Sequence, residues 1–195
     1  MYSNLIKCSS QDCEDSPEAD TFQNKINDYF LENCIGWKLV GGKVEIRGEE
    51  AFEKSMRSAQ EQLQSSDQYS TASNQLREAI IDLSRRPAAD TTGAIQHAMA
   101  SLECVARKIS GECTLTLGKI MDQNKITIPP PLDVAVIKAW GYASEYGRHL
   151  QEGRDPEFEE AELIVGICAS IGNYLVKKSH QRFLPTLQKL NHVNS

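Results

Sequence analysis

Arg148 and His149 are the two residues whose types and position best suit chemistry in this chain. An arginine guanidinium is a planar fork that matches phosphate oxygens, and an imidazole titrates near neutral pH and can move a proton. The pair stands where a helical pattern gives way to a polar loop, and loops carry function more often than helix interiors do. The alternative is structural, because both residue types satisfy the last carbonyls of a helix. Without further context, the structural interpretation is favoured.

A second helical pattern, over 91–110, holds two further candidates. His97 shares with Cys104 and Lys108 the face opposite the predicted core stripe, and such a face meets solvent, a second subunit or a substrate. Glu103 lies near the edge of the core stripe, where a carboxylate needs a cation. Arg148 is the predicted partner of Glu103, and the alternative is that Glu103 reaches water.

A run of acidic residues after Pro156 raises the question of a metal site. Favourable interaction with the helix dipole explains acidic residues in a first turn better than metal binding does. The chain has no zinc-like spacing of cysteine and histidine, and no glycine-rich nucleotide-binding motif. We therefore predict neither a metal nor a cofactor. The acidic residues concerned are Glu157, Glu159, Glu160 and Glu162.

Composition sets broad limits on the function. The chain has 195 residues, 40% of them hydrophobic and 25% charged, which suits one domain or one domain plus an appendage. A net charge of −6 argues against a nucleic-acid-binding protein with a basic surface throughout. The exception is the C-terminal end, which has no acidic residue after Glu162. Its cations could meet phosphate, although a helix C-terminus accounts for them more simply.

The six cysteines and the absence of targeting signals bear on location. No Cys-x-x-Cys occurs, and Cys104 and Cys168 lie in apolar helical patterns, as reduced thiols do. The N-terminus is polar, and no apolar run approaches the ~18 residues of a membrane helix. We expect a cytoplasmic protein with free thiols and no membrane contact.

Hydrophobic periodicity predicts a mostly α-helical fold, a bundle of helices with one small β-hairpin. Gly41-Gly42 suits a two-residue turn with positive φ at both positions, so 37–47 is predicted as a hairpin docked against helices. Asp90 is the expected N-cap of the helix that Gly111 ends, Thr114 caps a short helix over 115–121, and Asp155-Pro156 opens the last long helix. The other helices are expected over 18–33, 49–66, 70–84 and 132–147.

The predicted organisation has four parts. Residues 1–17 form a flexible lead-in, 18–66 a helix, hairpin and helix, 67–178 the helical bundle, and 179–195 a basic tail. Within the bundle, the helix over 132–147 is expected to bury Val136, Ile137, Trp140 and Ala143. The last helix is expected to carry an apolar stripe of Leu163, Ile164, Ile167, Cys168, Ile171, Tyr174 and Leu175.

Residues 22–178 resemble the C-terminal part of abortive-infection (AbiJ-type) phage-defence proteins. Several short matches occur in the same order, which is more specific than any one of them. The resemblance implies a HEPN domain, a small helical bundle that is often dimeric and widespread in toxin–antitoxin and antiviral systems. The matching segments are IGWKLVGGKVEIRG (35–48), LSRRPAADTTGAIQHAMASLECVARKISGE (83–112), LTLGKI (115–120), PPLDVAVIKAWGYASEYGRHLQEGR (130–154) and EEAELIVGICASIGNYLVKK (159–178).

The resemblance also bears on the site. Active members of the family are metal-independent ribonucleases, with an arginine followed four to six residues later by a histidine at the dimer interface. In this chain Arg148 and His149 are adjacent, so these two side chains would point about 100° apart on one helix. Arg154 is nearby in the sequence. Pairing across a homodimer could still bring an arginine and a histidine together.

Three hypotheses follow. The favoured one is a HEPN-like module that dimerises and binds RNA or a partner, such as a sensor domain. The alternative is a ribonuclease that uses Arg148 and His149, with Glu103, His97 and Arg154 in binding or support. An unrelated helical adaptor is the third hypothesis.

Overall fold

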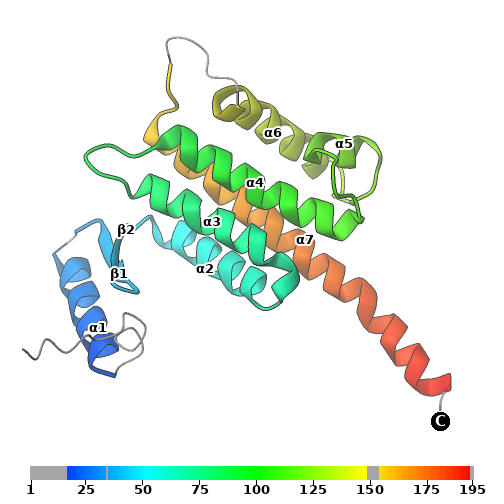
Figure 1. Ribbon diagram of the computed structural model, residues 1–195, viewed down its shortest axis with the longest axis horizontal. Helices are drawn as coiled ribbons and strands as arrows, with labels where there is room; N and C mark the ends of the chain where they lie inside the picture. The colour runs from blue at the N-terminus through cyan, green and yellow to red at the C-terminus, as the bar shows by residue number, and fades with distance from the viewer. Residues whose placement is uncertain (1–16, 34, 149–153, 194–195) are drawn as a thin grey trace, which may run out of the picture. The chain divides into compact units, whose positions relative to one another are not determined.

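The computed structural model describes residues 17–33, 35–148 and 154–193, and their side chains except in 147–148 and 182–193. The chain divides after Gly48 into two compact units, Met1–Gly48 and Glu49–Ser195. Helices make up most of the described residues, with a single two-stranded sheet among them (Figure 1). The predicted fold class, a mostly α-helical bundle with a small hairpin, is confirmed.

The described part of the first unit, residues 17–33 and 35–48, consists of one helix and the hairpin. Its elements are α1 (Pro17–Glu32), β1 (Trp37–Val40) and β2 (Lys43–Ile46). The strands are antiparallel, with Trp37 opposite Ile46 and Val40 opposite Lys43. The turn between them is Gly41-Gly42, whose φ angles of +52° and +73° confirm that both positions need the freedom of glycine.

The hairpin is held to α1 by side-chain amides. The amide of Asn27 donates to the carbonyl of Leu39 at 2.8 Å and accepts from its backbone N–H at 2.7 Å. Gln23, one helical turn earlier, accepts from the backbone N–H of Gly41 at 2.8 Å. Asn27 thus satisfies both backbone groups of Leu39, as a third strand would. A lone hairpin is marginally stable, and α1 supplies the partner it needs.

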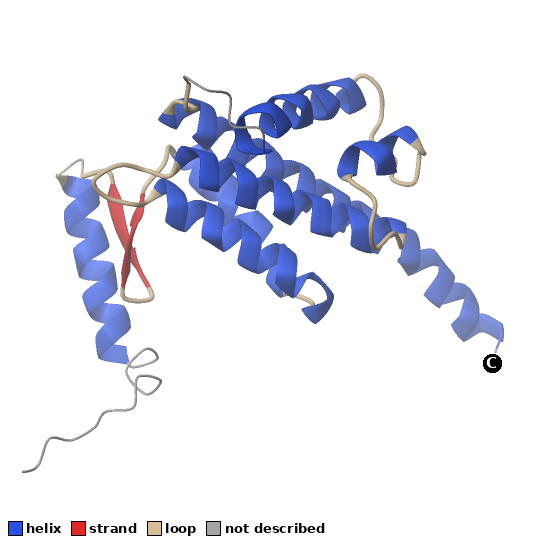
Figure 2. Cartoon of the chain, turned by 45° about the horizontal axis from the view of Figure 1, so that its top comes forward, coloured by secondary structure: helices blue, strands red, loops and turns tan. Residues whose placement is uncertain are grey.

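The second unit is the helical bundle. Helix α4 packs on α3, α5, α6 and α7, and α2 packs on α3 and α7 (Figure 2). The sequence predicts that the helix over 49–66 belongs with the hairpin. In the structure this helix is α2, and it packs with the bundle. The elements are α2 (Glu50–Gln64), η1 (Asp67–Tyr69), α3 (Ser70–Leu83), α4 (Thr91–Ser110), α5 (Leu117–Asp122), α6 (Leu132–Arg148) and α7 (Phe158–Val193).

Periodicity predicted the buried faces of the inner helices better than those of the outer ones. The predicted stripe of α3, Leu76, Ala79, Ile80 and Leu83, is buried throughout. On α6, Val136 and Ala143 are buried, but Ile137 is 44% exposed, contrary to expectation. On α7, Leu163 is 63% exposed although the predicted stripe included it. Helix α6 contacts the bundle along a narrow strip, which leaves apolar residues beside the strip in solvent.

Three helix ends differ from their predicted positions. The N-cap of α5 is Thr116 rather than Thr114, and its hydroxyl accepts from the N–H of Lys119. Helix α7 begins at Phe158, two residues after Pro156. The carboxylate of Glu160 accepts from the backbone N–H of Glu157 at this end. The same helix continues to Val193, so the described part of the predicted basic tail is helical.

Other local signals behave as expected. Asp90 caps α4 by accepting from the N–H of Gly93 at 2.7 Å, and Gly111 ends the helix with a φ of +77°. Cys104, Cys113 and Cys168 are free thiols, and burial raises the pKa of Cys168 to about 12. Across the described ranges, no helix is both long and apolar enough to cross a membrane.

Candidate functional site

Arg148 is the last described residue of α6, and the residues that follow it up to 153 lie outside the described part of the chain. The side chain of Arg148 and all of His149 lie outside the described residues. Their role as a catalytic or phosphate-binding pair therefore stays a prediction.

Arg154, on the far side of this loop, lies against the last turns of α6. Its guanidinium carbon is 5.6 Å from the centroid of the Tyr146 ring, within the range of a cation–π contact. The same guanidinium forms an ion pair with Glu160 in the first turn of α7. Because Tyr146 precedes Arg148 by two residues, the predicted site residue Arg154 is held close to the end of α6.

Two tyrosines and a carboxylate complete this corner. The rings of Tyr142 and Tyr146, one turn apart on α6, have centroids 4.6 Å apart. Burial raises the pKa of Tyr142 to about 12, and the neighbouring Glu160 adds to this rise. The N–H of Glu157 lowers the pKa of Glu160, which stays a carboxylate at neutral pH.

Glu103 is buried in α4, as its place near the core stripe suggested, and it does have an arginine partner. That partner is Arg107, one turn further along α4, whose guanidinium is 2.6 Å from the Glu103 carboxylate. The carboxylate also accepts from the N–H of Leu117 at 3.3 Å, at the start of α5. Arg107 thus supplies the cation that Glu103 needs, and pairing with Arg148 stays untested.

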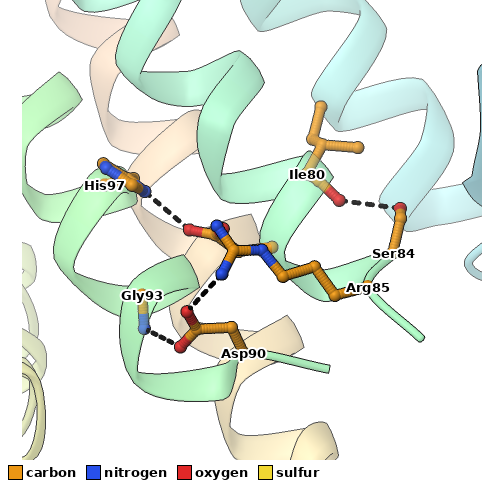
Figure 3. Close-up of polar contacts among 7 residues, drawn as sticks. Ile80, Ser84, Arg85, Asp90, Gly93 and His97 are labelled. Carbon is orange, nitrogen blue, oxygen red and sulfur yellow. Dashed lines mark hydrogen bonds and ion pairs between the residues drawn. The ribbon is translucent and has the colours of Figure 1, made fainter. Parts of the chain in front are cut away.

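His97 contacts a neighbouring helix and is also partly exposed to solvent. Its Nδ1 is 2.6 Å from the carboxylate of Asp82 on α3 (Figure 3). The sequence predicts that this face of α4 meets solvent, a subunit or a substrate, and it does not predict the contact with α3. The contact arises because α4 is central in the bundle and is covered on several sides. The imidazole remains one-third exposed, at 34%.

Asp82 is the centre of a polar cluster that joins α3 to α4. Its side chain is fully buried, with Arg85 2.7 Å from one oxygen and His97 on the other. Arg85 also reaches the N-cap Asp90 at 3.0 Å (Figure 3). The backbone carbonyl of Asp82 accepts from the N–H of Asp90 at 2.9 Å. A buried carboxylate needs such partners, and together they close the turn between the two helices.

The chemistry open to this cluster is limited but definite. A carboxylate that holds Nδ1 of an imidazole fixes the ring and leaves Nε2 for a second partner. The other contacts of Asp82 and Asp90 all stabilise the α3–α4 turn. The cluster therefore fits a structural role best. Its one imidazole, that of His97, is partly exposed.

Gly93 is required for the cluster to form. A Cβ atom at this position would lie 2.7 Å from Oδ2 of Asp90 and 2.8 Å from Oδ2 of Asp82. Neither carboxylate can retreat easily, because the first caps α4 and the second is held by His97.

The substitution Gly93→Ala should lower the free energy of unfolding by about 2 kcal/mol, as overpacking of a filled site does. Alanine would normally stabilise an open helix position relative to glycine, so the sign of the change is the test. Urea unfolding followed by circular dichroism measures it. Gly118→Ala, with 3.5 Å to the nearest Trp140 atom, is the matched control and should leave stability unchanged or raise it slightly. A neutral or stabilising Gly93→Ala would contradict the packing described here.

Sequence reasoning missed several residues of these two sites. Asp82 stands in a predicted apolar helix beside Leu83, and a carboxylate within a core stripe is the signal that could have found it. Tyr142 and Tyr146 are one turn apart just before Arg148, which could have indicated an aromatic pair. Glu160 was interpreted through the helix dipole alone, whereas it also binds Arg154.

The end of α6, the start of α7 and the Asp82 cluster lie at the same end of the bundle. Helix α4 begins at the end where α6 finishes and α7 starts, as both views show (Figures 1 and 2).

In the part of the chain that the structure describes, no group of three or more His, Cys, Asp or Glu side chains is placed to hold a metal ion.

Comparison with known proteins gives no assignment. No protein-family model, curated protein or solved structure matches this chain.

Proposed function

We propose that this protein is a HEPN-like module of a bacterial antiviral or toxin–antitoxin type system. In this proposal it forms a homodimer and binds RNA through the loop between α6 and α7. Arg148 and His149 contact phosphate at the end of α6, and Arg154 does so from the far side of the loop. A sensor domain or another protein would act through the same module.

The contact between Arg154 and Tyr146 is the observation that carries the proposal. It brings the two ends of the loop together, so Arg154 lies beside the turn that ends in Arg148. Cations gathered at one loop suit a phosphate backbone. Tyr146, which is half-buried, adds an aromatic surface of the kind on which unpaired RNA bases stack.

The exposed face of α6 supports the homodimer. Val134, Ile137 and Gly141 recur on one side of this helix and are all exposed. Exposed apolar residues at helical spacing favour packing against a second helix, and glycine allows close approach. Because α6 ends at Arg148, an isologous contact along this face would place two copies of the loop in one assembly.

A metal-independent ribonuclease is the alternative form of the proposal. Adjacent residues on a single helix point about 100° apart, so in this form of the proposal an arginine of one subunit would serve the histidine of the other. The histidine would then activate a ribose 2′-hydroxyl, and the arginine would stabilise the phosphate in the transition state. A cytoplasmic location belongs to the proposal and is supported by the free thiols of Cys104, Cys113 and Cys168.

RNA binding by single variants tests the site. Fluorescence anisotropy with a labelled single-stranded RNA at low salt should show binding by the wild type. Arg148→Ala, His149→Ala and Arg154→Ala should each weaken binding, the arginine variants by about tenfold, the scale for losing a hydrogen bond to a charged group. Arg77→Ala, an exposed arginine on α3, is the matched control and should bind as the wild type does.

The same samples separate the two forms of the proposal. Intact RNA after incubation with EDTA supports a binding module, while cleavage that His149→Ala abolishes supports the ribonuclease. Light scattering should give a dimer that Ile137→Glu converts to a monomer. Wild-type protein that binds no RNA, or that is a monomer at high micromolar concentration, would overturn the corresponding part of the proposal.

A further inference from the structure

A second basic site lies near the C-terminal end of α4, away from the loop. A pocket of about 250 Å³ opens between α4, α7 and η1, with Ile126 and Thr127 beyond α5 at its edge. Three of its lining residues are of the basic types, namely Lys108, Lys178 and His180, and none is an aspartate or glutamate. This concentration of positive charge is unusual on a chain whose net charge is −6.

The basic side chains of this pocket form no ion pairs with other described residues. Among the described residues, no carboxylate lies within ion-pair distance of Lys108, Lys178 or His180. Two carboxylates of the α4–α5 region are already engaged, Glu103 with Arg107 and Glu112 with Lys125. The part of α7 that lines the pocket adds none, because the chain has no acidic side chain after Glu162. The pocket therefore presents unneutralised positive charge, which attracts an anion.

The floor of the pocket is apolar and well ordered by packing. Tyr69, Ile126 and Leu175 are 4%, 5% and 3% exposed, and Ile109 is half-buried beside them. The pocket thus combines a buried aliphatic and aromatic floor with basic side chains at its rim. Ligand sites commonly join an apolar lining to a few charged groups that fix orientation. A ligand that matches both parts has a phosphate and a flat, weakly polar ring.

We propose that this pocket binds a nucleotide, with its phosphate between Lys108, Lys178 and His180 and its base on Ile109, Ile126 and Leu175. The nucleotide is either free in solution or part of a nucleic-acid strand. The site is distinct from the α6–α7 loop, because Lys108 stands 17 residues beyond the start of α4, about 25 Å along the helix. The inference does not rest on the proposed function.

Titration calorimetry with 5′-AMP tests the pocket at low salt. The wild type should bind 5′-AMP, adenosine should bind much more weakly because it lacks the phosphate, and inorganic phosphate should compete. Lys178→Glu and Lys108→Glu should each weaken 5′-AMP by at least about tenfold, because each replaces a charged hydrogen-bond donor by a like charge.

Lys177→Glu is the matched control. It makes the same charge change one residue away, but Lys177 points to α2, with its Nζ 3.4 Å from the hydroxyl of Ser58. Binding of 5′-AMP should stay within about twofold of the wild type in this variant, since only long-range charge is altered. Thermal unfolding of all variants checks that each is folded, and Lys178→Met gives a second, neutral removal of the charge.

The outcomes distinguish the two sources of the nucleotide. Binding of 5′-AMP that depends on Lys178 assigns a free mononucleotide. If 5′-AMP does not bind, but a short RNA binds the Arg154→Ala protein in a way that depends on Lys178 and not on Lys177, the ligand is a nucleotide of a strand. Equal losses in Lys177→Glu and Lys178→Glu, or no dependence of either ligand on Lys178, would overturn the inference. Neither of these negative results bears on the proposed RNA binding at the α6–α7 loop, which the variants Arg148→Ala, His149→Ala and Arg154→Ala test separately.

Discussion

Replacing both side chains that contact the Asp82 carboxylate, in the double variant Arg85→Ala/His97→Ala, should lower the free energy of unfolding by about 3–5 kcal/mol. The reason is that Asp82 is fully buried, with Arg85 at one carboxylate oxygen and His97 at the other. Removing them leaves a buried charge without a cation. Chemical denaturation at pH 7 measures the loss.

Each single variant should cost less than the double one, because one partner remains beside the carboxylate. Arg85 is 53% exposed and His97 34% exposed, so neither side chain carries much packing energy of its own. Adding Asp82→Asn to the double variant should recover part of the stability, since it removes the unpaired charge. A triple variant no more stable than the double one would contradict this account. So would a double variant as stable as the wild type.

The substitution Arg107→Ala should lower the free energy of unfolding by about 3 kcal/mol, near the lower end expected for a broken buried ion pair. Glu103, whose side chain is 8% exposed, would lose the guanidinium at 2.6 Å. The N–H of Leu117 would still donate to its carboxylate, which limits the cost. Arg107 also donates through Nε to the carbonyl of Leu115 at 2.8 Å, so the turn before α5 would loosen as well.

Lys108→Ala is the matched control for this prediction. It removes a cation from the next residue of α4, but Lys108 is exposed and is in no ion pair within the described ranges. Its effect should stay within about 0.5 kcal/mol, as at an ordinary surface position. Thermal and urea unfolding should rank the two variants in the same order. If Lys108→Ala proved as destabilising as Arg107→Ala, the cost could not be assigned to Glu103.

The sequence by itself determined the helices, the hairpin and several of their ends. Leu76, Ala79, Ile80 and Leu83 recur at the helical period, and this stripe is buried in α3 as expected. Asp90 and Gly111 act through bonds and backbone angles within their own turn. Such features depend on neighbours a few residues away, so spacing and residue type suffice to predict them.

Only the tertiary structure decided which side chains meet. His97 and Asp82 are 15 residues apart on different helices. The hydrophobic periodicity of α3 and that of α4 do not indicate that these two side chains would share a hydrogen bond. Arg154 lies on Tyr146 because α7 starts where α6 ends. The exposure of Ile137 likewise depends on which side of α6 packs against the bundle, since Val136 and Ala143 of the same helix are buried. A helical period specifies a face, but the neighbour that covers the face is set by how the helices pack against one another.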